Sequence, residues 1–108
     1  MSELVEKLSA GEHALEISIR PDRTPVALKE CLDRGYFHVK FTQTRGGTDL
    51  YVPLDRDHTD LSGGDFTAGS GVVKLAGKIT LDYVPVRCVA SIELASMRGL
   101  GHLEKIQN

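Results

Sequence analysis

The feature that most constrains this chain is a long run of alternating apolar and polar residues between positions 71 and 96. In its first half the apolar side chains occupy odd positions, and after Pro85 they occupy even positions. The apolar sets are Val73, Leu75, Ile79, Leu81 and Tyr83, followed by Val86, Cys88, Ala90, Ile92 and Leu94. A period of two is typical of a half-buried β-strand, so the run predicts two strands joined as a hairpin.

The first of these strands is long for a small domain. At about 3.3 Å per residue it would reach roughly 40 Å, whereas a domain with a radius of gyration of about 13 Å has a diameter of roughly 35 Å. We therefore expect the strand to curl. Gly77 occupies a core-facing position in its middle and marks the expected bulge or sharp bend. A curled hairpin predicts a sheet that wraps around one core.

Two other segments have the pattern of helices. Residues 25–34 follow Thr24, a good N-cap, and begin with Pro25, which suits the first helical position. Gly35 is well placed to end this helix. A second helix, of two turns at most, is expected at residues 3–10.

Alternation predicts further strands, at residues 12–20, 36–43, 50–54 and 101–105. Residues 45–48, Arg-Gly-Gly-Thr, are expected to form a hairpin turn, and short turns favour antiparallel pairing. The sequence therefore predicts a mainly β fold (α+β by the count of elements). We expect a curled antiparallel sheet or small open barrel of five to six strands, with one packed helix and a short N-terminal helix. A chain of 108 residues is expected to form a single domain, residues 1–108.

Composition places the chain among ordinary globular proteins, with 41% hydrophobic and 26% charged residues. No run approaches the length of a membrane span, and the first residues mix charged and apolar side chains, so we expect a cytoplasmic protein.

Cys31 and Cys88 fall in a helical and a core-facing strand pattern, and are expected to be buried free thiols. A formal net charge of −2 gives no long-range attraction to nucleic acid.

The sharpest functional signal is the octapeptide RGYFHVKF at residues 34–41. It resembles the central signature of the RNA-recognition motif, which reads basic, Gly, aromatic, small, aromatic, Val, any residue, aromatic. The matching residues are Arg34, Gly35, Tyr36, Val39 and Phe41, with His38 in place of the second stacking ring. The resemblance implies that Tyr36 and His38 lie on an open sheet face where bases stack, with Arg34 and Lys40 beside them.

The octapeptide also departs from the motif. Phe37 stands where a small residue is expected, residues 12–20 contain no aromatic partner, and no second helix is predicted after Leu54. These departures favour the interpretation that Gly35 ends a helix and Tyr36 is a solvent-facing strand residue. We therefore do not expect nucleic acid to be the partner.

Residues 55–70 form an aperiodic segment rich in Asp, Gly, Ser and Thr, expected to be a functional or mobile loop or a packed Ω-loop. It contains four candidate metal ligands within six positions, namely Asp55, Asp57, His58 and Asp60. Carboxylates spaced by one residue can converge on a hard cation, although the calcium-loop pattern fails at its sixth and twelfth positions. The alternative is polar turn formation, and we expect no cofactor.

No arrangement for nucleophilic catalysis stands out, because the four histidines are scattered singly and no Gly-x-Ser-x-Gly motif occurs. We interpret the protein as a non-catalytic interaction or ligand-binding module for a protein or small molecule, able to self-associate through unprotected sheet edges. The first alternative is a small enzyme with a pocket near residues 55–70. The second is a single-stranded RNA or DNA binder that uses Tyr36 and His38.

Overall fold

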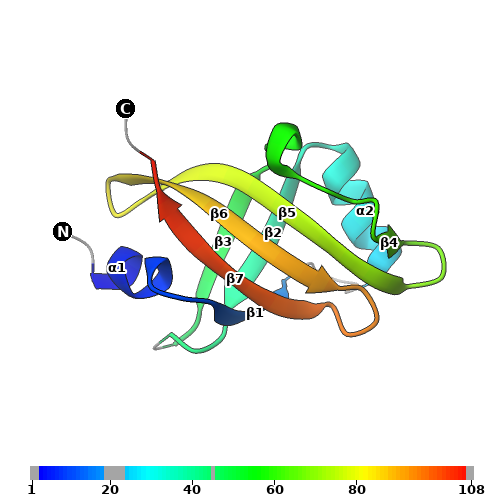
Figure 1. Ribbon diagram of the computed structural model, residues 1–108, viewed down its shortest axis with the longest axis horizontal. Helices are drawn as coiled ribbons and strands as arrows, with labels where there is room; N and C mark the ends of the chain where they lie inside the picture. Colours follow the sequence, from blue (N-terminus) through cyan, green and yellow to red (C-terminus); the bar gives the residue numbers. More distant parts are fainter. Residues whose placement is uncertain (1–2, 19–23, 45, 107–108) are drawn as a thin grey trace.

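The computed structural model describes residues 3–18, 24–44 and 46–106. In this part of the chain one antiparallel sheet curls around a core, and two helices pack against it (Figure 1). The helices are α1 (Glu3–Ser9) and α2 (Pro25–Asp33). The strands are β1 (His13–Ile17), β2 (Tyr36–Phe41), β3 (Thr48–Pro53), β4 (Gly64–Asp65), β5 (Ser70–Leu81), β6 (Val84–Glu93) and β7 (Arg98–Lys105).

The sheet has the strand order β3-β2-β1-β7-β6-β5-β4 and is not closed into a barrel. The mainly β fold predicted from the sequence is confirmed, with seven strands where five to six were expected. The additional strand is β4, which pairs its two residues with Ser70 and Gly71. Two residues cannot display a period of two, so nothing in the sequence marks them as a strand. Of the predicted strand at 12–20, residues 19 and 20 lie outside the described residues.

The β5–β6 hairpin is the longest pairing in the sheet, and its register runs unbroken from Val72 opposite Glu93 to Leu81 opposite Val84. The two residues of its turn, Asp82 and Tyr83, have φ angles of 50° and 66°. A two-residue turn with positive φ at both positions matches the right-handed twist of the flanking strands. Neither residue is glycine, so the turn carries the cost of a left-handed backbone with a side chain attached.

Tyr83→Gly is therefore expected to raise the free energy of unfolding by about 1 kcal/mol, because glycine adopts positive φ without that cost. The tyrosine ring is 99% exposed and gives up no packing when it is removed. Urea unfolding measures the effect, and Tyr83→Ala is the matched control because it removes the ring but keeps the strain. A glycine variant no more stable than the alanine variant would contradict this account of the turn.

Gly77 does not form the predicted bulge. It pairs with Cys88 in the regular register of the hairpin, with no extra residue in either strand. Instead, the end of β3 returns to β5 at this point: Leu54 forms a bridge with Gly77, and the Asp55 N–H donates to the Ala76 carbonyl oxygen at 2.8 Å. A Cβ atom on Gly77 would overlap the carbonyl oxygen of Pro53. The glycine is therefore required by a close backbone approach between two strands that are distant in sequence.

The core lies inside the curl of the sheet, between its concave face and the two helices. Strands β2 and β6 contribute every second residue, as their alternating burial shows. From the helices, Val5 and Leu8 of α1 and Leu28 and Leu32 of α2 are buried. The start of α2 is held as predicted, because the Thr24 hydroxyl oxygen accepts a hydrogen bond from the Ala27 N–H at 3.1 Å.

Both cysteines are free, as predicted. Cys88 is fully buried on the concave face of β6, but Cys31 is only partly buried, so the prediction of two buried thiols is wrong for Cys31. It lies beside the stripe formed by Leu28 and Leu32 on α2 rather than within it. Among the described residues, no helix has the length and apolar character needed to cross a membrane.

Candidate functional site

Three aromatic side chains gather on the convex face of β2 and β3, and we call Tyr36, His38 and Tyr51 the aromatic patch. Alternation along β2 turns Phe37, Val39 and Phe41 into the core, so the residues between them face outward. The register places His38 directly opposite Tyr51 and Tyr36 opposite Pro53. The outward orientation predicted for Tyr36 and His38 is therefore what the structure shows.

The three rings of the aromatic patch contact one another. The Tyr36 and Tyr51 rings stack at an interplanar angle of 28°, with centroids 5.2 Å apart, and the His38 ring meets Tyr51 edge-on at 5.1 Å. Tyr36 and His38 are 5.6 Å apart. Such pairs stabilise a sheet and restrict the rotation of each ring. Tyr51 is nevertheless 57% exposed, so the patch offers an ordered aromatic surface to solvent.

Tyr51 is the residue that the sequence analysis missed. The RNA-recognition motif would place a second aromatic strand at residues 12–20, which contain no phenylalanine, tyrosine or tryptophan. The second aromatic strand is β3, which β2 reaches through the turn at Gly46 and Gly47. Counting outward positions from that turn would have placed Tyr51 opposite His38, since β3 alternates with Leu50 and Val52 inward.

The two basic residues predicted beside the rings have different positions. Lys40 is on the same face of β2, but its register partners are Asp49 of β3 and Glu16 of β1, so an acidic residue lies on each side. Arg34 is exposed at the C-terminal cap of α2, where its backbone N–H bonds to the helix. It is therefore outside the strands that carry the patch. The patch has no basic border formed by these two residues.

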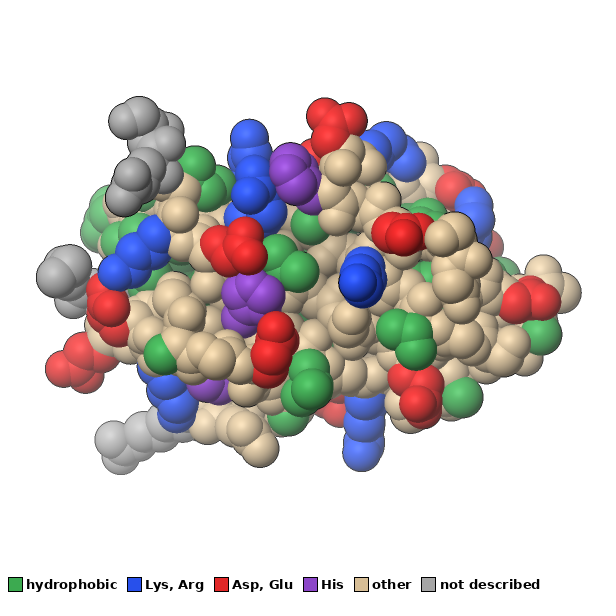
Figure 2. Space-filling view, viewed as in Figure 1, with side chains coloured by type: hydrophobic (Ala, Val, Ile, Leu, Met, Phe, Trp, Pro, Cys, Tyr) green, Lys and Arg blue, Asp and Glu red, His purple; other side chains and the backbone are tan. Residues whose placement is uncertain are grey.

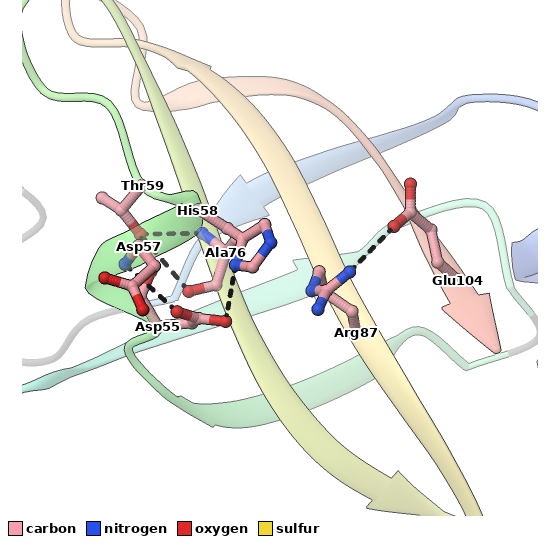
Figure 3. Close-up of polar contacts among 7 residues, drawn as sticks. All are labelled: Asp55, Asp57, His58, Thr59, Ala76, Arg87 and Glu104. Carbon is pink, nitrogen blue, oxygen red and sulfur yellow. Dashed lines mark hydrogen bonds and ion pairs between the residues drawn. The ribbon is translucent and has the colours of Figure 1, made fainter. Parts of the chain in front are cut away.

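The candidate metal ligands of the 55–70 segment form turns (Figure 3). Asp55 caps the 3-10 helix Arg56–His58: its carboxylate accepts from the Asp57 N–H at 3.1 Å and lies 2.9 Å from His58 Nδ1. Asp60 accepts separately, from the backbone N–H and the hydroxyl group of Ser62. Within the described ranges no three His, Cys, Asp or Glu side chains are placed to hold a metal ion. The structure does not bring the four predicted ligands together.

Polar contacts set the pKa of Asp55. Partial burial acts to raise it, but the hydrogen bond and the charge of His58, together with the Asp57 N–H, outweigh burial and lower the pKa. The Asp55 carboxylate therefore stabilises the turn through its contacts with Asp57 and His58. This arrangement supports the alternative of polar turn formation.

A surface hollow of about 420 Å³ lies beside this turn, at the place where β3 meets β5. Its polar lining comes from Asp55, Arg56, Asp57, His58 and Lys78. The nearby Thr59 hydroxyl donates to the Asp55 carbonyl oxygen at 2.7 Å and is engaged with β5 (Figure 3). Among the described residues, the side chains lining this hollow include no serine, threonine or cysteine, so its histidine–carboxylate pair has no hydroxyl or thiol nucleophile among them.

A second histidine has acidic neighbours on the convex face of β7. His102 Nε2 lies 2.9 Å from Glu104, and its Nδ1 is within ion-pair distance of Glu12, at 3.0 Å. The hydrogen bond with His102 is the main cause that lowers the pKa of Glu104, and Arg87 adds to it from 3.7 Å (Figure 3). These contacts tie residue 12 to β7. The cluster has a structural role, because Arg87 faces Glu104 and the His102 ring lies between Glu104 and Glu12.

No protein-family model matches the chain, and no curated protein matches it at a significant level.

Proposed function

We propose that the protein is a non-catalytic binding module whose binding surface is the aromatic patch. The observation that carries this proposal is the exposed ring of Tyr51, held in place by Tyr36 and His38. Tyrosine is enriched in binding surfaces because it supplies a large contact area with few rotatable bonds and retains a polar tip. Rings that are already ordered lose little conformational entropy when a ligand binds.

The packing inside the sheet supports a site on its outside. Phe37, Phe41, Leu15 and Leu75 are fully or almost fully buried and fill the curl. A ligand held inside the sheet would have to displace these side chains, whereas the convex face of β2 and β3 offers aromatic area without any rearrangement. Binding at the aromatic patch therefore requires less rearrangement of the protein than binding inside the sheet does.

Nucleic acid is the less favoured ligand for this patch. Affinity for a phosphate backbone comes from Lys and Arg side chains that displace counterions, and Lys40 has acidic residues as both of its register partners. Figure 2 shows a different face from the patch, the one in front of β5, β6 and β7, and acidic and basic side chains are mixed there too. A protein or a small molecule with an apolar or planar group is the ligand class that this surface fits.

The proposal can be tested by titrating the ¹⁵N-labelled protein with phenol, indole and isobutanol, and separately with mixed-sequence single-stranded RNA. We expect the two aromatic probes to shift the amide signals of Tyr36, His38 and Tyr51 more strongly than isobutanol does. Tyr51→Ala should weaken this response about tenfold or more, as for a residue that dominates an interface. Tyr83→Ala is the matched control, since it removes an exposed tyrosine on another strand pair.

Two results would overturn the proposal. Aromatic probes could leave the patch signals unchanged, or could shift them equally in Tyr51→Ala. Salt-dependent binding of RNA that is lost in Tyr51→Ala would instead assign the patch to nucleic acid.

A further inference from the structure

Strand β3, which carries Tyr51, is the last strand at one side of the sheet. The N–H of Leu54, directly after β3, donates to the Gly35 carbonyl oxygen at 2.9 Å. Successive residues of a strand point their backbone groups to opposite sides, so the N–H groups of Asp49 and Tyr51 face away from β2. In the described part of the chain neither of these N–H groups has a backbone partner. We call this stretch, residues 49–51, the free edge of β3.

The free edge of β3 ends where the sheet curls back on itself. Pro53 has no N–H group, and beyond it the Asp55 N–H is bonded to the Ala76 carbonyl oxygen of β5. The edge is therefore open over a short length next to the aromatic patch and closed after it. At about 3.3 Å per residue it offers about 10 Å of unpaired backbone.

At the other side of the sheet, the edge of β5 is covered by the chain that follows β3. The loop after β3 runs along β5, and Asp60 and Lys74 exchange two backbone hydrogen bonds of 2.9 and 2.8 Å. The Val72 N–H is bonded to the Gly63 carbonyl oxygen at 3.1 Å. Proteins commonly cover or interrupt exposed strand edges because these edges pair with other chains. The contrast between the covered edge of β5 and the free edge of β3 marks the latter as a pairing site.

We propose that the free edge of β3 binds an extended polypeptide segment as an additional strand, with one of its side chains resting on the aromatic patch. This inference rests on the proposed function, because it names the partner of the same surface. In strand addition the main-chain hydrogen bonds supply affinity and alternate side chains supply specificity. Tyr51 provides both elements here, since its N–H belongs to the free edge and its ring to the patch.

The length of the edge decides between a peptide and a second copy of this chain. A stable protein dimer buries about 800 Å² on each partner. An edge of about 10 Å that stops at a proline supplies much less area on its own. A short extended segment is therefore the occupant that fits.

Charge specifies the segment further. Asp49 is exposed on the convex face with Lys40 as its register partner, but within the described residues it forms no ion pair. A paired strand places every second side chain on this face. A segment with an aromatic or large apolar residue over Tyr51 and a lysine or arginine two residues away, beside Asp49, is the expected ligand.

The test begins with selection of binders from a random ten-residue peptide library displayed on phage. One selected peptide is then synthesised, and its affinity is measured calorimetrically. Asp49→Pro removes an edge N–H, whereas Asp49→Ala is the matched control that removes only the carboxylate. Proline at this edge is compatible with the fold, because Pro53 already occupies it. We expect Asp49→Pro to bind about tenfold or more weakly than Asp49→Ala, as for loss of a hydrogen bond at a blocked edge.

N-methylated versions of the peptide provide a second measurement that does not depend on folding of a variant. Methyl groups on alternate residues in one phase should abolish binding, because those N–H groups face β3. In the other phase they should leave binding unchanged, because those groups face solvent. Strand pairing alone predicts this dependence on phase.

The outcomes separate the two proposals. If binding is lost in Tyr51→Ala but is insensitive to Asp49→Pro and to both N-methyl phases, the patch binds a peptide without strand addition and only the present inference is wrong. If the selected peptide binds Tyr51→Ala as well as wild type, the proposed function is wrong too. A library that yields no binder, or a wild-type dimer at micromolar concentration that Asp49→Pro dissociates, would overturn the peptide as the occupant.

Discussion

Gly77→Val is expected to lower the free energy of unfolding by about 3 kcal/mol, the upper part of the range for overpacked sites. A Cβ atom at this position would overlap the Pro53 carbonyl oxygen and the Val52 side chain. The backbone cannot move away freely, because the Leu54–Gly77 bridge and the bond between Asp55 and Ala76 hold the two strands together. The substitution therefore forces β3 and β5 apart at the only described place where their backbones pair.

Urea unfolding followed by circular dichroism measures this loss, and Thr80→Val is the matched control. Thr80 is an exposed position of the same strand, so valine there places the same side chain on β5 and only replaces a hydroxyl group by a methyl group. The control should stay within about 0.5 kcal/mol of wild type. Equal stabilities of Gly77→Val and wild type would show that β3 does not approach β5 as described.

Gly77 also shows what the sequence can and cannot predict. Its position in an alternating run marks it as special, because a glycine at a core-facing position offers no side chain to pack. The reason for the glycine depends on Pro53 and Leu54, which are more than twenty residues away along the chain. Periodicity describes one strand at a time. Periodicity therefore predicted the β5–β6 hairpin but not the approach of the end of β3 to β5.

The 55–70 segment illustrates the same limit. Its carboxylates have two physical uses, since they can bind a cation or accept hydrogen bonds from nearby backbone N–H groups. In the structure Asp55, Asp60 and Asp65 each accept a bond from an N–H two residues ahead. Spacing alone does not separate the two uses, because both need short polar side chains close together.

Only part of the aromatic patch could be predicted from the sequence. Tyr36 and His38 follow from alternation within one strand, which is a local property of the sequence. Tyr51 depends on the pairing register between two strands, and that register is set by the geometry of the turn between them. The convex position of these rings, the packed core behind them and the free edge of β3 are the features on which the proposed binding surface rests.

Cys88→Ser is expected to lower the free energy of unfolding by about 2 kcal/mol, because a hydroxyl group buried without a hydrogen-bond partner loses its contact with water. Cys88 is fully buried on β6, with Gly77 and Leu103 as its register partners. The matched control is Cys31→Ser on α2. The Cys31 side chain is only partly buried, so water can solvate the new hydroxyl and the change should stay within about 0.5 kcal/mol.

Alkaline pH gives an independent check on the same residue. Burial raises the pKa of the Cys88 thiol from its ordinary value of 9.0 to about 12. The unfolded chain therefore loses this proton at lower pH than the folded protein does, and ionisation in the unfolded state favours unfolding. The stabilising contribution is complete below pH 9.0 and is lost as the pH rises toward about 12. Wild type should lose more stability across this interval than Cys88→Ser, which has no thiol there to ionise. Parallel pH profiles for the two proteins would show that the Cys88 thiol is accessible to water in the folded state.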